Sequence, residues 1–262
     1  MASSQPKSTL YRGSPDHGGF GGSPFSTKLE FRFRHAKLPY NVAAGSPKTG
    51  PKGKVPYVDL SVFQTSDASA GPSLMGDSTF IIQHLLASHR LPDLNEDLSD
   101  EQRLNDLALR ALLEEKLYFY LMRERWLDNY YTQRDTALYA IPYPIRIFVG
   151  LLVHRTVTST LHGQGVGRLT GEEVRGLETE IWQTLESVLE QRMRKATPQK
   201  VFWALGGKQP TEADATLFGF IVSVLATETA PESKKMVKKF PCVSEYAKRI
   251  HRQYFPDYEM WT

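Results

Sequence analysis

The two most informative runs of this chain are Gly53-Lys54-Val55-Pro56-Tyr57-Val58-Asp59-Leu60 and, further along, Gly76-Asp77-Ser78-Thr79-Phe80-Ile81-Ile82. The first run predicts a short β-strand that is entered through a proline. The second predicts a turn whose Asp-Ser pair begins a helix, with Phe80, Ile81 and Leu85 on its buried side. A proline at the start of a strand cannot donate to the ladder, so the backbone groups of its neighbour stay available for another partner.

The chemistry of these two runs is complementary. A serine at a helix N-terminus offers a hydroxyl, free backbone N–H groups and the positive end of the helix dipole, all of which suit a carboxylate. Taken singly, the first run is an ordinary edge strand and the second an ordinary helix cap. Their order and spacing instead favour a pocket for a small acidic peptide, which pairs with the strand and is held by the helix start.

Composition limits the class of protein. The chain has 262 residues, of which 40% are apolar and 23% charged, with a formal net charge of +3. These values are typical of a soluble globular protein of one or two domains. Lys and Arg are scattered, so we do not expect nucleic acid as a partner. The seven histidines show no paired spacing beside carboxylates, and we expect no metal site.

Cysteine use and apolar runs indicate the compartment. Cys242 is the single cysteine, which excludes an intramolecular disulfide and a Cys-x-x-Cys redox pair and fits a reducing environment. Residues 1–7 lack the apolar core of a signal peptide. The most apolar run, residues 138–153, is interrupted by Pro142, Pro144 and Arg146 and is too short to span a bilayer. We therefore expect a cytoplasmic protein.

The first part of the chain alternates between strands and helices. We expect strands at residues 8–11, 39–42, 56–60 and 74–75, and helices at 25–36 and 78–89. In the first helix the apolar residues recur every three or four positions, with Lys28, Glu30, Arg32 and Arg34 on the polar side. This order predicts a thioredoxin-like α/β domain over residues 1–89.

Residues 90–98 are polar and contain a proline, as a linker does, and residues 99–262 are expected to form an all-helical domain. Helix starts are predicted at Ser99, Thr170 and Thr211, each followed three residues later by an acid or amide, and near Pro241. For the first of these helices the expected apolar face consists of Leu104, Leu107, Ala108, Ala111, Leu112, Tyr118 and Met122.

Lys-Val-Pro before a strand, followed by Asp-Ser at a helix start, resembles the glutathione site of glutathione S-transferases. The turn from Gly207 to Asp214 is similar to the capping box of that family's helical domain. The resemblance implies that Val55 and a cis Pro56 bind the cysteinyl part of glutathione. It implies that Asp77 and Ser78 bind the γ-glutamyl part and that Lys54 faces a carboxylate. Residues 23–30 and 53–57 resemble the failed-axon-connections and metaxin-like branch.

The resemblance places the thiolate-stabilising hydroxyl near the start of the first helix. Pro24 suits the first helical position, which makes Ser23 the N-cap and the first choice for this role. Ser26 is the second choice, and Ser14 and Tyr11 follow because other classes place the catalytic group nearer the first strand. As a plain helix cap, Ser23 needs no catalytic role.

An insertion precedes this helix. It contains Asp16-His17-Gly18-Gly19-Phe20-Gly21-Gly22 and is either a flexible surface loop or a lid over the second-substrate site. Under the second interpretation Phe20 is its apolar contact. The same pocket is expected to include Phe25, Tyr118 and Met122.

The resemblance implies a glutathione-dependent enzyme that acts on a hydrophobic, electrophilic small molecule. Thiolate addition gives either conjugation, as in a transferase, or addition–elimination, as in a cis–trans isomerase. A homodimer is expected. The alternative is a non-enzymatic metaxin-like adaptor or a glutathione-binding protein.

Overall fold

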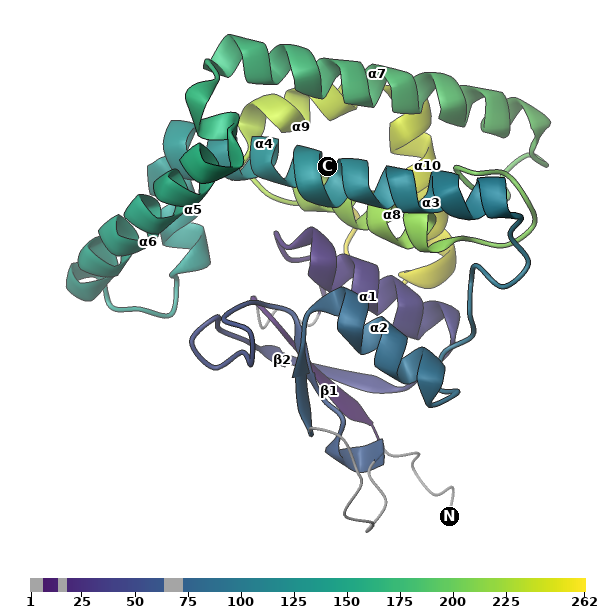
Figure 1. The fold of residues 1–262 in the computed structure, drawn as a ribbon, viewed down its shortest axis with the longest axis horizontal. Coiled ribbons are helices and arrows are strands. Elements are labelled where there is room, and N and C mark those ends of the chain that lie inside the picture. The colour runs from purple at the N-terminus through teal and green to yellow at the C-terminus, as the bar shows by residue number, and fades with distance from the viewer. Residues whose placement is uncertain (1–6, 14–17, 64–72) are drawn as a thin grey trace.

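A computed structural model describes residues 7–13, 18–63 and 73–262. In these ranges a four-stranded sheet is formed by β1 (Ser8–Arg12), β2 (Tyr40–Ala44), β3 (Tyr57–Asp59) and β4 (Leu74–Gly76), in the order β2-β1-β3-β4. β1 runs parallel to β2, while β3 is antiparallel to both β1 and β4. The helices α1 (Pro24–His35) and α2 (Ser78–Ala87) lie together on one side of this sheet, as Figure 1 shows. The predicted α/β arrangement is confirmed.

The rest of the chain is helical. Helix α7 (Gly171–Lys195) runs along the top of the molecule and α8 (Glu212–Leu225) lies between it and α1, while α5 (Tyr130–Ala137) and α6 (Tyr143–Gln164) project from one end (Figure 1). None of the helices within the described ranges is long and apolar enough to cross a membrane. The helical elements, including the short η1 beside the sheet, are η1 (Ser61–Phe63), α3 (Asp100–Leu112), the π-helical η2 (Leu113–Leu117), α4 (Tyr118–Arg123), the π-helical η3 (Glu124–Asp128), α5 (Tyr130–Ala137), α6 (Tyr143–Gln164), η4 (Val166–Arg168), α7 (Gly171–Lys195), α8 (Glu212–Leu225), α9 (Pro231–Lys238) and α10 (Pro241–Tyr254).

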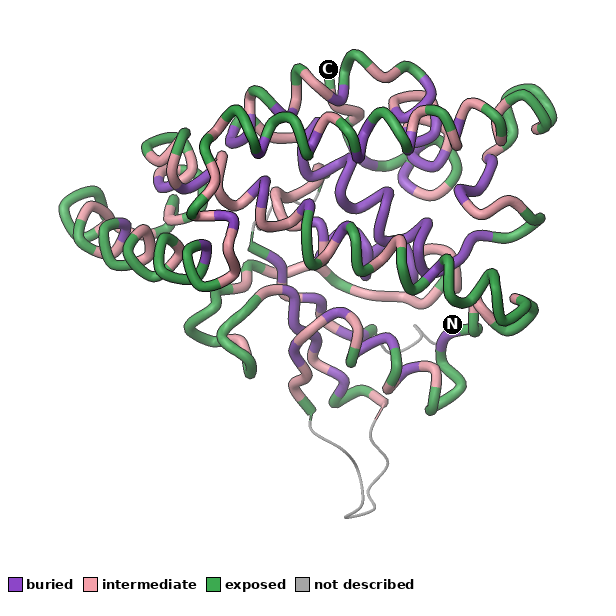
Figure 2. Tube along the Cα trace, turned by 45° about the horizontal axis from the view of Figure 1, so that its top comes forward, coloured by how far each residue is buried: buried purple, intermediate pink, exposed green. Residues whose placement is uncertain are grey.

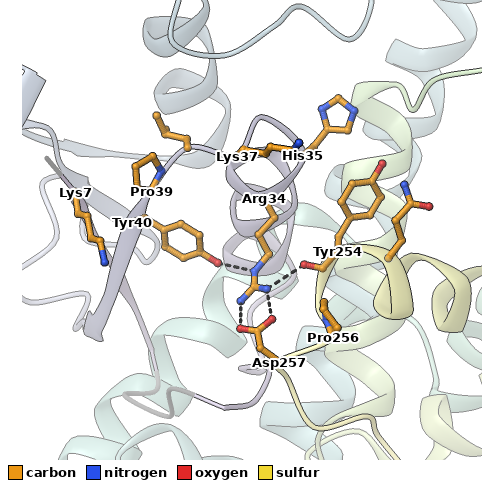
Figure 3. A pocket seen from close by; sticks show the side chains of 11 residues that line it. Lys7, Arg34, His35, Lys37, Pro39, Tyr40, Tyr254, Pro256 and Asp257 are labelled. Atoms are coloured by element: carbon orange, nitrogen blue, oxygen red, sulfur yellow. Dashed lines mark hydrogen bonds and ion pairs between the residues drawn. The ribbon is translucent and has the colours of Figure 1, made fainter. Parts of the chain in front are cut away.

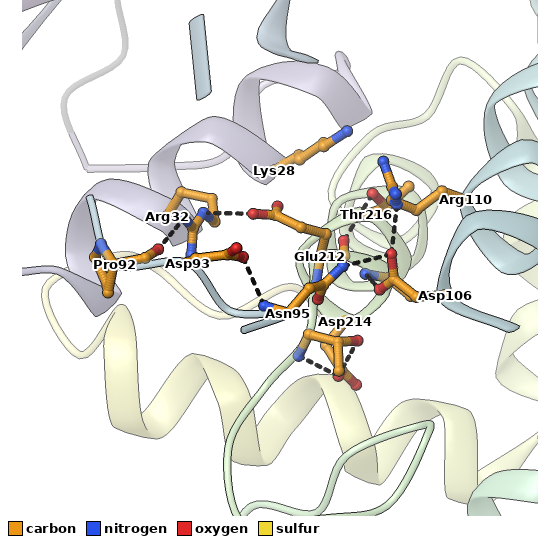
Figure 4. Close-up of polar contacts among 12 residues, drawn as sticks. Lys28, Arg32, Pro92, Asp93, Asn95, Asp106, Arg110, Glu212, Asp214 and Thr216 are labelled. Carbon is orange, nitrogen blue, oxygen red and sulfur yellow. Dashed lines mark hydrogen bonds and ion pairs between the residues drawn. The ribbon is translucent and has the colours of Figure 1, made fainter. Parts of the chain in front are cut away.

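Helix α8 is the centre of the core, since all of its residues are buried. Its close approach to α1 requires Gly219, where a Cβ would lie 2.4 Å from the carbonyl oxygen of Pro24. The start of α8 is held by carboxylates (Figure 4). Asp214 accepts from the backbone N–H groups of Ala204 and Thr211 at 2.7 and 2.8 Å, and Asp106 of α3 accepts from that of Ala213 at 2.7 Å. These bonds satisfy amides that no helical carbonyl can reach.

The predicted polar side of α1 is wrong for its central residues. Lys28, Glu30 and Arg32 are at most 2% exposed, because α1 is enclosed between the sheet and α8 and has little surface left for solvent. Their charges are paired instead. Glu30 meets Arg12 at 2.7 Å, Lys28 meets Glu114 at 2.6 Å and Arg32 meets Glu212 at 3.2 Å.

The apolar face predicted for α3 is also wrong, and the face predicted for α2 is wrong at Phe80. On α3, Leu104 is 65% and Leu107 55% exposed, whereas Asp106 is fully buried. The face of α3 that turns toward α8 carries the carboxylate that caps it, so the leucines point outward. On α2, Phe80 is 50% exposed, whereas Ile81 and Leu85 are buried as predicted. Figure 2 shows the buried residues gathered in the interior of the helical part and in the layer beneath it.

Candidate functional site

The two runs singled out in the sequence meet at one junction. The Val55–Pro56 peptide bond is cis, as the resemblance implies. Directly after it, Tyr57 of β3 pairs with Gly76 of β4. The backbone N–H of Asp77 then donates to the carbonyl oxygen of Pro56 at 3.3 Å. The proline turn and the start of α2 are therefore neighbours.

This junction leaves polar groups available. Asp77 has a positive φ of 78° and is the N-cap of α2, where one carboxylate oxygen accepts from the N–H of Thr79 at 3.0 Å. Ser78 follows as the first residue of α2. Within the described part of the chain, the Ser78 hydroxyl and the backbone amide and carbonyl of Val55 make no hydrogen bond. A free strand-like backbone beside a helix start is the arrangement that a short acidic peptide needs.

A lysine also borders this junction. Lys54, nominated from the sequence, is exposed. Lys52, which the sequence analysis did not select, places its amine 3.8 Å from the centroid of the Phe80 ring, on the first turn of α2. The same loop passes close to β4, because a Cβ on Gly76 would lie 3.5 Å from the backbone nitrogen of Lys52. Lys52 therefore brings positive charge to the start of α2, and sequence spacing alone gave no signal for it.

The candidate hydroxyls differ in accessibility. Ser23 is the N-cap of α1 and its oxygen accepts from the N–H of Ser26 at a long 3.4 Å. Ser23 is half-buried, whereas Ser26 is 1% exposed and its hydroxyl has no partner in the described ranges. Tyr11 stacks on Tyr57 with ring centroids 4.7 Å apart. Ser14 lies outside the described residues. Solvent access therefore favours Ser23 over Ser26, and the catalytic role itself stays a prediction.

Sequence reasoning missed a buried arginine behind Ser23. Arg125 of η3 is 5% exposed. It donates to the carbonyl oxygen of Gly22 at 2.9 Å and to that of Ser223 on α8 at 2.8 Å. Its charge thus lies close to the N-terminus of α1 and is bonded to carbonyls rather than to a carboxylate. No local signal marks it, because Arg125 stands among other charged residues, Arg123, Glu124 and Asp128.

The predicted second-substrate residues are partly brought together. The rings of Phe25 and Tyr118 meet edge to face at 5.2 Å, joining the start of α1 to α4. Burial raises the pKa of the Tyr118 hydroxyl, which keeps it neutral. Met122 is half-buried against the helical core.

The expected role of Phe20 as the apolar contact of a lid is wrong. Its ring lies 5.0 to 6.0 Å from five aromatic rings: Phe218 of α8, His251 of α10, and Phe255, Tyr258 and Trp261 of the C-terminal segment, residues 255–262. The carbonyl oxygen of Gly18 also accepts from the N–H of Glu259 at 2.8 Å. The described end of the glycine-rich insertion is therefore fastened to the C-terminal segment, and Phe20 is a packing residue. Asp16 and His17 lie outside the described residues.

A cavity of about 670 Å³ lies at the opposite end of α1, between Tyr40 and the C-terminal segment (Figure 3). Arg34 at its centre is already engaged by Asp257, by the Tyr40 hydroxyl at 2.8 Å and by the carbonyl of Tyr254 at 3.0 Å. This cavity is separate from the junction of Pro56 and Asp77, and its main cation is neutralised.

The sequence of this chain is similar to a glutathione S-transferase family model and to several known proteins. A family model described as the glutathione S-transferase N-terminal domain matches residues 24–131. Mouse Metaxin-2 is 25% identical over 227 residues, covering 84% of this chain and 78% of its own. An isoprene-epoxide–glutathione S-transferase from Rhodococcus is 25% identical over 233 residues and covers 87% of both chains.

Among solved structures, glutathione transferase GSTFuA2 from Phanerochaete chrysosporium is similar, with a TM-score of 0.59 and 14% identity. It covers 95% of this chain and 98% of its own. FzlA from C. crescentus has a TM-score of 0.53, also at 14% identity, and covers 98% of this chain and 94% of its own. At this identity the two structures support the fold alone. The family model over residues 24–131 and the sequence relatives support a metaxin-like protein of the glutathione S-transferase superfamily.

Proposed function

We propose that this protein binds glutathione at the junction of Pro56 and Asp77 and uses its thiolate to attack a hydrophobic, electrophilic small molecule. The observation that carries the proposal is the bond from the Asp77 N–H to the Pro56 carbonyl. It sets the free backbone of Val55 beside the free hydroxyl of Ser78. The cysteinyl backbone pairs with Val55, and the γ-glutamyl carboxylate binds at the start of α2, near Lys52 and Lys54.

The start of α1 supplies thiolate stabilisation. A free thiol has a pKa near ~8.5 and reacts as the thiolate. Lowering that pKa by about two units requires about 2.7 kcal/mol of preferential thiolate stabilisation. The Ser23 hydroxyl, the dipole of α1 and the N–H of Phe25, which makes no hydrogen bond within the described residues, supply a share of this. The Arg125 charge behind Gly22 adds to it.

The Rhodococcus relative, named for an epoxide substrate, favours conjugation over isomerisation. The thiolate attacks one epoxide carbon, the C–O bond breaks and the released alkoxide takes a proton from solvent. Phe25, Tyr118 and Met122 supply the apolar wall for such a substrate. Addition to a polarised double bond, followed by rotation and loss of thiolate, is the isomerase variant of the same first step. We further propose a cytoplasmic homodimer.

The second candidate is a non-enzymatic metaxin-like adaptor, which the alignment with Metaxin-2 over 84% of this chain favours. Two measurements separate the candidates. Reduced glutathione at about 100 times its dissociation constant is expected to stabilise the protein by about 2.7 kcal/mol, seen as a rise in Tm. Incubation with glutathione and a small aliphatic epoxide is expected to give the thioether adduct by mass spectrometry. No rise in Tm argues against the site, and a rise without adduct favours the glutathione-binding adaptor.

A further inference from the structure

The hairpin of α5 and α6 carries an apolar surface that no other part of the described structure covers. On α6, Ile145, Phe148 and Leu152 are spaced three and four residues apart and so share one face. This hairpin projects from the body at one side of the molecule in Figure 1 and shows few buried residues in Figure 2. We call the following residues, each 45–72% exposed, the hairpin patch: Tyr131, Tyr139, Tyr143, Ile145, Phe148, Leu151 and Leu152.

The two helices beneath the patch are held together. Gly150 allows them to approach, because a Cβ there would lie 2.7 Å from the side chain of Arg134. The Arg134 guanidinium lies 5.4 to 5.9 Å from the ring centroids of Tyr130, Tyr131 and Tyr143. The patch is therefore presented by a packed helical pair, and binding through it needs no folding of this segment.

The charges around the patch are mostly basic, and Asp135 of α5 is paired with both Arg134, at 2.8 Å, and Arg146, at 3.7 Å. Residues 136–171 contain no Asp or Glu, while they include Arg146, Arg155 and Arg168. Arg155 and Arg168 are exposed. The exposed leucines of α3 are a contrast, since that helix begins with Asp100-Glu101 and is followed by Glu114-Glu115.

We propose that the hairpin patch binds the surface of a membrane that contains anionic lipid. An exposed apolar helix face flanked by basic residues is suited to the boundary between headgroups and acyl chains, and tyrosines favour that depth. A second copy of the chain is a poorer occupant, because a symmetric contact would bring the arginines of the two copies together. Arg155, which lies three residues after Leu152 on α6, meets anionic headgroups instead.

The test is co-sedimentation of the whole chain with vesicles of phosphatidylcholine and phosphatidylserine, against vesicles of phosphatidylcholine alone. Phe148→Glu and Leu152→Glu change the patch at positions that are 70% and 67% exposed, and Leu104→Glu is the matched control at 65% exposure on α3. Circular dichroism verifies that each variant keeps its fold. Arg155→Glu tests the electrostatic part.

We expect the wild type to sediment with the anionic vesicles and less with the neutral ones. Each patch variant should lower the partition coefficient at least about tenfold, and Arg155→Glu about tenfold, while Leu104→Glu leaves it unchanged. Three results overturn the proposal: a wild type that stays in the supernatant, patch variants that sediment like the wild type, or an oligomer that Phe148→Glu dissociates. The last would assign the patch to a second copy. None of these results depends on glutathione binding.

Discussion

Ser23→Ala probes the proposed chemistry most sharply. In the structure the Ser23 oxygen makes one long cap bond, of 3.4 Å, to the N–H of Ser26. Losing so long a bond should cost stability only about 0.5–1 kcal/mol. A hydrogen bond to a charged sulfur contributes about 1.5–3 kcal/mol. Loss of the hydrogen bond to sulfur is therefore expected to raise the pKa of the bound glutathione thiol by roughly one to two units.

The effect of Ser23→Ala should appear in the turnover rate. We expect turnover to fall by about ten- to a hundredfold with little change in glutathione affinity, because the hydroxyl favours the thiolate far more than the thiol. The thiolate's ultraviolet absorbance, titrated against pH in the binary complex, measures the shift. Ser26→Ala is the matched control, because the Ser26 hydroxyl is buried. An unchanged titration in Ser23→Ala would refute the reasoning.

Three further outcomes are expected. Burial raises the pKa of Glu178 to about 7 from an ordinary 4.5, so the folded chain keeps a proton that the unfolded chain releases. The free energy of unfolding therefore falls by up to about 3 kcal/mol as pH rises from about 4.5 to 7. The Tm of Glu178→Gln should exceed that of the wild type at pH 8 and equal it near pH 4.5. Equal Tm values at both pH values would contradict this. Asp214→Ala leaves two buried amides unpaired and should lower the free energy of unfolding by about 2–4 kcal/mol, seen in urea titrations, while glutathione affinity of the folded fraction stays the same. Arg125→Met should also raise the thiol pKa, and an unaltered thiolate titration would assign this arginine to packing alone.

Much of the α/β part was predictable because its signals are local. Pro56 marks the strand entry, Pro24 makes Ser23 the N-cap, and Asp77 caps α2 two residues before the amide that it binds. Each of these features depends on neighbours within a few residues.

The errors concern contacts between distant parts of the chain. The partner of Lys28 is Glu114, and that of Arg125 is the carbonyl of Gly22, in each case far along the sequence. Helical periodicity counts such charges as solvent-exposed because it cannot see a partner. Phe20 is a similar case, since its aromatic neighbours belong to α8 and the C-terminal segment.

The exposed leucines of α3 have a related cause. Apolar periodicity assigned Leu104 and Leu107 to the core, yet the buried position between them is Asp106. Its carboxylate accepts from the N–H of Ala213, from Asn95 and from Arg110. A buried acid that caps another helix reverses the face that periodicity predicts, and no local pattern marks it.

The central claim is a glutathione site at the junction of Pro56 and Asp77, and calorimetric titration with reduced glutathione tests it most directly. We predict binding by the wild type. Asp77→Ala and Ser78→Ala should each weaken it by about 1–3 kcal/mol, through loss of charge-assisted bonds to the γ-glutamyl group. Ser88→Ala at the other end of α2 is the matched control and should bind like the wild type. Wild-type affinity in both Asp77→Ala and Ser78→Ala, or no heat of binding in any of these proteins, would contradict the claim.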